Sequence, residues 1–209
     1  MSVVTITRQY GAGGSLVAQG VAGRLGWTVI DNEFVGEVAR RAGLPAETVA
    51  AREERPPSLI ERLGRTLSVS APEMFVPAAA AELDEDALHR ITERVIAEAA
   101  AHGRVVLVGR GATACLATAG ETAGALHVYV VAPLDARIAT VAGRQQVGHD
   151  EAARLVHDVD ARRARYLEHY YGRRRDDPAI YHLVVNTGWL GYDGASEIVV
   201  DAARRRGLR

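Results

Sequence analysis

The sequence predicts an α/β domain built on a parallel sheet of about five strands, with helices on both faces. Apolar runs of strand length alternate with helical patterns, which is typical of strands joined by crossover helices. These runs show no polar alternation, as expected for a sheet that is covered on both sides. With 209 residues, 48% of them hydrophobic, the chain can bury one sizeable core, and we expect a single domain over residues 1–209.

The amino-terminal part of the chain has the pattern of strand, glycine loop, helix and strand. Val3 to Thr7 is a short apolar run rich in the β-branched residues that favour strands. Apolar residues then recur at helical spacing up to Leu25, and Gly26 is a typical residue to end a helix. Trp27 to Ile30 is predicted to be a second buried strand, with Asp31 at its carboxyl end.

The segment from Asn32 to about Leu83 breaks this alternation. It contains two helical stretches, at about residues 33–42 and 58–67, with Pro56 and Pro57 between them. We therefore predict a helical excursion over residues 32–83 that contributes no strand to the sheet.

The rest of the chain resumes the alternation of helices and strands. Asp86 can cap a helix that stops at Gly103. The later strands are predicted at Val105 to Val108, Ala125 to Val131 and Leu183 to Val185. The later helices are predicted at Leu134 to about Arg144, at about Asp150 to Tyr171, and from near Asp193 onward.

Charge and composition exclude several classes of function. The net charge of −1 provides no overall field that would attract nucleic acid or an anionic membrane. The single cysteine, Cys115, cannot form an internal disulfide, and residues 1–7 lack a signal-peptide pattern. No apolar run approaches the roughly 20 residues that span a bilayer. We expect a cytoplasmic protein that binds neither nucleic acid nor a membrane; a homo-oligomer is possible.

All 25 basic residues of the chain are arginine, and no lysine is present. Biased codon usage explains such a composition, but the chemical consequence is the same. Arginine stays charged at any biological pH, and its planar fork matches the geometry of phosphate. Any side chain that neutralises a phosphate in this protein must therefore be an arginine.

The glycine-rich segment, Gly11-Ala12-Gly13-Gly14-Ser15, is a candidate phosphate-binding loop. A turn between a strand and a helix aims backbone N–H groups at one point, and the helix dipole reinforces them. The same glycines could also merely permit a tight turn. The usual P-loop pattern is G-x-x-x-x-G-K-[ST]; in this alignment Arg8 replaces the first glycine and Gly14 replaces the lysine.

Five ordered stretches carry a resemblance that covers essentially the whole chain. They are Ile6 to Ser15, Asp31 to Glu33, Val108 to Ala112, Asp160 to Tyr166, and Asp177-Pro178 together with Tyr181 to Thr187. Together they resemble the cytidylate kinase-like family, a lysine-less branch of the nucleoside-monophosphate kinases. The resemblance implies a P-loop NTPase-type sheet, a helical excursion at residues 32–83 that binds the acceptor, and an arginine-rich lid in the region 145–180.

The resemblance also implies Mg²⁺-dependent phosphoryl transfer from ATP or GTP to a small acceptor, a nucleoside monophosphate such as CMP. A second hypothesis is a kinase for a different small acceptor, because an aspartate at the end of the second strand also resembles dephospho-coenzyme-A kinases. A third hypothesis is a nucleotide-binding sensor or partner protein without catalysis. The absent P-loop lysine keeps this third hypothesis open.

The nucleotide-binding candidates are Gly11, Ala12, Gly13, Gly14 and Ser15. Ser15 occupies the position whose hydroxyl normally contacts Mg²⁺, although it could instead cap the helix. Arg8 is a catalytic candidate that could restore the missing charge at the phosphates, or it could form only a surface ion pair. A lysine introduced at position 14 is expected to preserve or raise nucleotide binding.

Asp31 and Arg110 are candidates for binding the acceptor. Asp31 ends a strand where ligands collect in open α/β sheets, so it could bind the acceptor, serve catalysis by orienting metal-bound water, or only cap a helix. Arg110 lies between two glycines and looks like the arginine that related kinases use on the acceptor's phosphate. The acidic residue that follows this arginine in cytidylate kinases is replaced by Gly111.

The arginine-rich helix supplies the remaining candidates. Its arginines could form a solvated ion-pair surface, or part of a lid that neutralises the transferring phosphoryl group. By resemblance, Arg163 is the leading catalytic residue of the lid, and Arg137 is a weaker candidate. Asp160 lies three residues before Arg163 on the same helix face, so the two could act together, and we predict that Asp160 binds the substrate.

Overall fold

A computed structural model describes residues 2–31, 85–109, 111–118, 120 and 124–208. It contains one sheet of five parallel strands in the order β2-β3-β1-β4-β5. The strands are β1 (Val3–Arg8), β2 (Thr28–Asp31), β3 (Val105–Val108), β4 (Ala125–Val131) and β5 (Leu183–Asn186). This arrangement confirms the predicted fold class.

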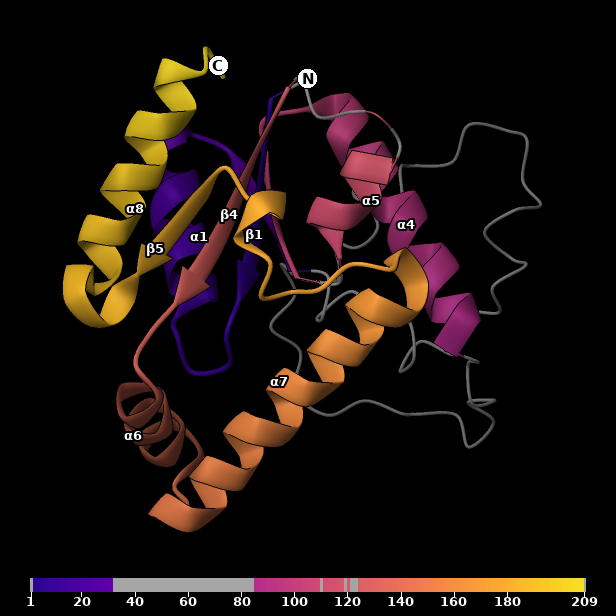
Figure 1. Cartoon of the computed structure of the whole chain (residues 1–209). Helices are drawn as coiled ribbons and strands as arrows, with labels where there is room; N and C mark the ends of the chain where they lie inside the picture. Colours follow the sequence, from indigo (N-terminus) through magenta and orange to yellow (C-terminus); the bar gives the residue numbers. More distant parts are fainter. Residues whose placement is uncertain (1, 32–84, 110, 119, 121–123, 209) are drawn as a thin grey trace, which may run out of the picture.

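Helices cover both faces of the sheet (Figure 1). They are α1 (Gly14–Leu25), α4 (Glu85–His102), α5 (Ala112–Thr118), α6 (Leu134–Gln145), α7 (His149–Tyr171) and α8 (Thr187–Arg205), with a short 3₁₀ helix, η1 (Pro178–Ile180). Residues of α1 and α8 share one buried apolar cluster with the sheet, and residues of α4 and α5 share another. Helices α6 and α7 pack on each other beyond the carboxyl ends of the strands (Figure 1).

The predicted strands agree with the structure to within one residue at each end. Several features differ from the prediction. Asp86, the predicted cap of α4, lies within the helix, which begins at Glu85. The last helix begins at Thr187 instead of near Asp193, and Gly191 interrupts its helical geometry with φ 67° and ψ 173°. The short helix α5 was not predicted. The excursion at residues 32–83, with its two expected helical stretches, lies outside the described residues.

A chain of buried polar groups crosses the sheet beneath α5. The Thr5 hydroxyl lies 2.8 Å from His127 Nδ1 and 2.8 Å from the Thr113 hydroxyl. These contacts join β1, β4 and α5, and all three residues are buried. Burial lowers the pKa of His127 to about 4, with a smaller contribution from neighbouring His182. The imidazole is therefore neutral at physiological pH.

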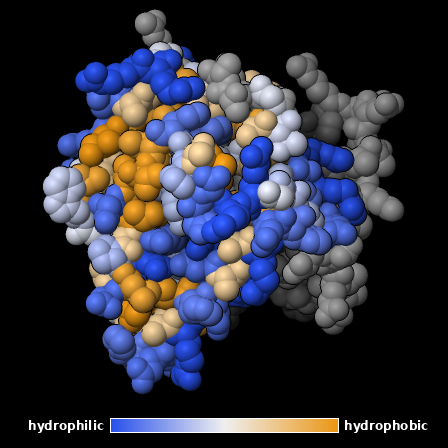
Figure 2. All heavy atoms as spheres, in the orientation of Figure 1, coloured by the Kyte–Doolittle hydropathy of each residue, from blue (hydrophilic) through white to orange (hydrophobic). Residues whose placement is uncertain are grey.

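The surface carries an apolar area on the side of β5 and α8 (Figure 2). Val184 of β5 is 46% exposed and Ile198 of α8 is 40% exposed, and β5 forms one edge of the sheet. The prediction of a homo-oligomer stays a prediction, since a single chain does not test it. Among the described residues, no helix combines the length and the apolar character that a membrane span requires.

Candidate active site

The candidate phosphate loop connects the end of β1 to the start of α1. Gly11 and Gly13 adopt positive φ angles of 81° and 76°, which favour glycine, and α1 begins at Gly14. The first turn of a helix has N–H groups without partners inside the helix, and they lie at the positive end of its dipole. The predicted loop therefore has the backbone geometry of an anion-binding turn.

Two later helices pack directly against this loop. A Cβ added at Gly11 would lie 2.6 Å from the carbonyl oxygen of Arg137 in α6, and one at Gly13 would overlap the ring of Tyr192 in α8. The Thr187 hydroxyl, at the start of α8, donates to the carbonyl of Ala12 at 2.8 Å. Both glycines are thus required by close packing as well as by their backbone angles.

The side chain of Arg8 explains the glycine at the usual lysine position. A Cβ added at Gly14 would lie 2.6 Å from Cβ of Arg8 and 2.9 Å from its Cγ. The guanidinium of Arg8 lies against Gly109, just after β3, where an added Cβ would overlap Nη1. This geometry argues against the expectation that a lysine at position 14 preserves nucleotide binding, because the Arg8 stem occupies the space that the lysine needs; the effect on binding stays a prediction.

Three of the predicted site residues meet at the carboxyl edge of the sheet. Arg8 Nη2 lies 3.3 Å from Asp31 Oδ1, and the Ser15 hydroxyl donates to Asp31 Oδ2 at 3.1 Å. Arg8 is buried, with 6% of its side chain exposed, whereas 27% of Asp31 is exposed. The hydroxyl and the carboxylate are hard oxygen donors of the kind that Mg²⁺ prefers, so the predicted magnesium ligand Ser15 lies beside a second suitable ligand.

Asp160, predicted to bind the substrate, accepts three hydrogen bonds from the protein. Its Oδ1 accepts from the backbone N–H of Tyr10 and from Nη1 of Arg175, both at 2.9 Å. Its Oδ2 accepts from Nη1 of Arg137 at 2.6 Å. The sequence suggested Arg163 as the partner of Asp160, but the structure pairs it with Arg137 and Arg175. Direct contact between Asp160 and a substrate stays a prediction.

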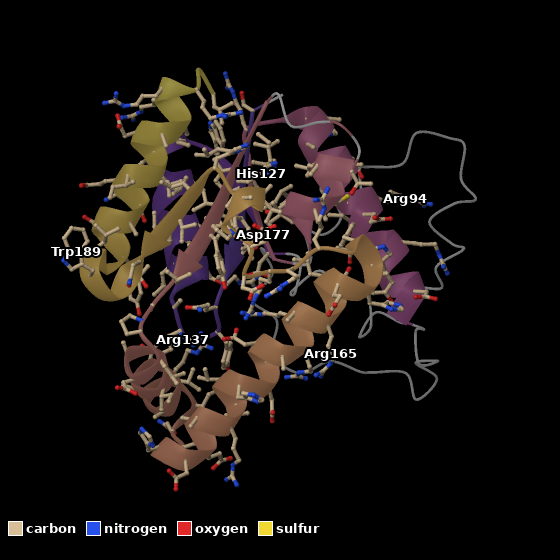
Figure 3. All side chains as sticks on the ribbon, in the orientation of Figure 1. Arg94, His127, Arg137, Arg165, Asp177 and Trp189 are labelled. Carbon is tan, nitrogen blue, oxygen red and sulfur yellow. The ribbon has the colours of Figure 1, made fainter. Side chains whose placement is uncertain are left out.

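Arg163 approaches the loop from α7. Its Nη1 donates to the carbonyl of Arg8 at 3.3 Å, and its guanidinium lies 5.6 Å from the ring centroid of Tyr10. Arg137 lies between α6 and the carboxyl ends of the strands (Figure 3). The predicted acceptor-binding residue Arg110 lies outside the described residues. Arg175 was not singled out by the sequence pattern, because it belongs to a run of three arginines.

A family model extends these observations over most of the chain. The model of the cytidylate kinase-like family matches residues 3–188. The chain belongs to the cytidylate kinase-like family. This assignment confirms the resemblance that the five sequence stretches carry.

Three curated relatives of this family member are cytidylate kinases. The protein from Sulfolobus acidocaldarius is 32% identical over 84 residues, which cover 40% of this chain and 46% of that protein. The protein from Desulfurococcus amylolyticus is 40% identical over 76 residues, 35% of this chain and 40% of that protein. The protein from Methanocaldococcus jannaschii is 30% identical over 121 residues, 58% of this chain and 65% of that protein. The chain thus matches less than two thirds of the length of each of these relatives.

Two solved structures share the fold of this cytidylate kinase-like protein. An uncharacterized protein from Eubacterium ventriosum aligns with a TM-score of 0.69 at 18% identity, covering 98% of this chain and 99% of that chain. Shikimate kinase from Bacteroides thetaiotaomicron aligns with a TM-score of 0.53 at 15% identity, covering 98% of this chain and 96% of that chain. At these identities the alignments show the P-loop kinase fold alone.

Proposed function

We propose that this protein transfers the terminal phosphoryl group of ATP or GTP to a small acceptor, a nucleoside monophosphate such as CMP. The observation that carries the proposal is the cluster of Arg8, Asp31 and Ser15 beside the first turn of α1. It brings a cation, a carboxylate and a hydroxyl together at the edge of the sheet where nucleotides bind in open α/β folds. The family membership of the chain supports the same reaction class.

In this proposal the loop from Gly11 to Ser15 holds the phosphates of the donor nucleotide through its backbone N–H groups. Arg8 supplies the positive charge that lysine supplies in the usual P-loop. Its buried stem fixes the guanidinium between the loop and Gly109, so little side-chain freedom remains to be lost on binding. Arg163 of α7 adds a second cation at the same loop. Phosphoryl transfer depends mainly on such positioning and charge stabilisation.

The oxygen donors of Ser15 and Asp31 fit a magnesium ion, and these two residues would hold it. When bound, Mg²⁺ neutralises charge on the phosphate oxygens. The protein's own contribution is to keep the hydroxyl and the carboxylate together, 3.1 Å apart, with Arg8 bound to the other carboxylate oxygen.

The acceptor is proposed to bind next to Asp31 and Arg110, with residues 32–83 as its binding excursion and the region 145–180 as the lid. The glycine at position 111, where cytidylate kinases have an acidic residue, favours testing acceptors other than CMP as well. A different small alcohol or phosphate as acceptor is therefore the second candidate function.

A turnover screen tests the proposal. The full chain is incubated with ATP or GTP, with Mg²⁺ or EDTA, and with each nucleoside monophosphate, dephospho-coenzyme A or no acceptor, and the phosphorylated products are followed by ³¹P NMR. We expect product that requires both Mg²⁺ and one acceptor. Nucleotide binding without turnover on any acceptor would favour a sensor or partner protein instead. No nucleotide binding at all would contradict the proposed donor site.

A further inference from the structure

The residue that precedes the glycines of the phosphate loop is held by one largely buried ion pair. The backbone N–H of Tyr10 donates to Asp160 Oδ1 at 2.9 Å, and its backbone carbonyl accepts from Arg137 Nη1 at 3.2 Å. The same Arg137 nitrogen lies 2.6 Å from Asp160 Oδ2. Both backbone polar groups of Tyr10 are therefore bound by two oppositely charged side chains that also bind each other.

The ring of Tyr10 also lies near cations of α6 and α7, the two helices that carry Arg137 and Asp160. The guanidinium of Arg144, in α6, lies 5.5 Å from the ring centroid, and that of Arg163, in α7, lies 5.6 Å from it. Cations at this distance from an aromatic face are attracted to it. The entry into the phosphate loop is thus fixed by α6 and α7 through the backbone and through the side chain of one residue.

Asp160 is the common acceptor in this arrangement. Its carboxylate binds Tyr10 of the loop, Arg137 of α6 and Arg175 of the segment after α7, while Asp160 itself belongs to α7. Only 14% of its side chain is exposed, and Arg137 and Arg175 are 9% and 13% exposed. Hydrogen bonds between charged groups are strong in such partly dry surroundings, and leaving one partner behind is costly.

From these contacts we infer that Asp160 is a positioning residue, which holds the phosphate loop in its binding conformation and couples it to α6 and α7. Arg137 transmits this effect beyond Tyr10, because its carbonyl oxygen and Cβ pack against Gly11. Loss of the negative charge would weaken the bond to the Tyr10 N–H and leave two largely buried guanidiniums without their anionic partner. The loop would then open more often and bind phosphates less well. The effect on phosphate binding rests on the proposed function, whereas the effect on the loop backbone does not.

The test compares Asp160→Asn with Asp176→Asn in the full chain. Asp176 accepts from Arg174 in an exposed pair, 70% and 77% exposed, so its loss controls for a missing carboxylate in the same part of the protein. The first measurement is amide hydrogen exchange without any ligand. We expect exchange at Tyr10 and the following loop amides to be roughly tenfold to a hundredfold faster in Asp160→Asn, the range for one charge-assisted hydrogen bond, and unchanged in Asp176→Asn.

The second measurement is calorimetric binding of inorganic tripolyphosphate, which needs neither acceptor nor turnover. We expect roughly tenfold or more loss of affinity in Asp160→Asn, and partial recovery in Asp160→Glu, which keeps the charge. Should Asp160→Asn fail to fold, Arg137→Gln removes the contact to the Tyr10 carbonyl and is expected to act in the same direction.

Unchanged loop exchange in a folded variant would overturn the inference, and so would tighter tripolyphosphate binding, which would make Asp160 a competitor of phosphate. A wild-type chain that binds neither tripolyphosphate nor nucleotide would instead contradict the proposed function. In that case the exchange measurement still decides the role of Asp160.

Discussion

The stem of Arg8 and the backbone of Gly14 share a space that admits only one side chain: a Cβ added at Gly14 would lie 2.6 Å from the Cβ of Arg8. The two departures from the usual P-loop pattern are therefore one structural feature. An arginine at the first position of the pattern requires a glycine at the lysine position. The positive charge that the usual pattern places at the start of the helix lies at the end of β1 in this protein.

This relationship predicts a double-mutant effect. Gly14→Lys alone should destabilise the protein by about 1–3 kcal/mol, because it forces a side chain into occupied space. Arg8→Gly combined with Gly14→Lys restores the usual P-loop pattern. The double variant should regain most of the lost stability and should bind nucleotide with an affinity close to that of wild type. Denaturant unfolding and nucleotide binding measure both quantities. Gly23→Lys is the control, since nothing lies within 4 Å of a Cβ added at Gly23 in the same helix. Additive effects of the two substitutions would contradict the shared space.

The charge of Arg8 is predicted to act in turnover. Arg8→Met keeps most of the buried stem and removes the guanidinium, so folding should be nearly intact. Loss of one charge-assisted contact to phosphate costs on the order of 2–4 kcal/mol in the transition state, which is roughly 10²–10³ in rate. Arg24→Ala, which removes a more exposed arginine paired with Asp193, serves as the control and should leave the rate unchanged. Equal rates in wild type and Arg8→Met would remove Arg8 from the site.

The sequence predicted the strands well because of how they end. β3 is a continuous apolar run that ends at Gly109, and β4 is an apolar run, interrupted only by His127, that ends shortly before Pro133. Helix α5 escaped prediction because its seven residues, ATACLAT, contain too few large apolar side chains to show a period. The first turn of α8 escaped because the glycines at 188, 191 and 194 weaken the helical signal.

The site was predictable where it depends on strand ends and not where it depends on helix packing. Arg8 and Asp31 each end a strand, and parallel strands bring these ends to one edge. The pair of Arg137 and Asp160 joins two helices across 23 positions of sequence. Spacing along α7 suggested Arg163 as the partner of Asp160 instead, because the spacing within one helix does not show how α6 packs on α7.

The hydroxyl of Ser15 is predicted to set the magnesium requirement of turnover. Ser15→Ala removes one of two adjacent oxygen donors and leaves the carboxylate of Asp31 in place. We expect the Mg²⁺ concentration for half-maximal rate to rise roughly tenfold, as for one lost charge-assisted contact. Thr140→Ala, which removes an exposed hydroxyl bonded within α6, is the control. A magnesium titration of each variant tests this, and identical curves for Ser15→Ala and wild type would exclude Ser15 as a ligand.

The neutral imidazole of His127 predicts a pH dependence of stability. Its pKa is lowered from 6.5 to about 4 by burial, so between these values the unfolded chain binds a proton that the folded chain does not. This contribution to stability is therefore fully present above pH 6.5 and is lost as the pH falls toward 4; it amounts to about 3 kcal/mol.

His127→Gln, which keeps a polar partner for Thr5, should flatten the curve of unfolding free energy against pH in that window. His182, whose pKa burial also lowers, keeps its own contribution in the variant. The measurement is urea unfolding from pH 4 to 8, with His157→Gln as an exposed control. Parallel curves for His127→Gln and wild type would show that the buried imidazole is not the group that titrates.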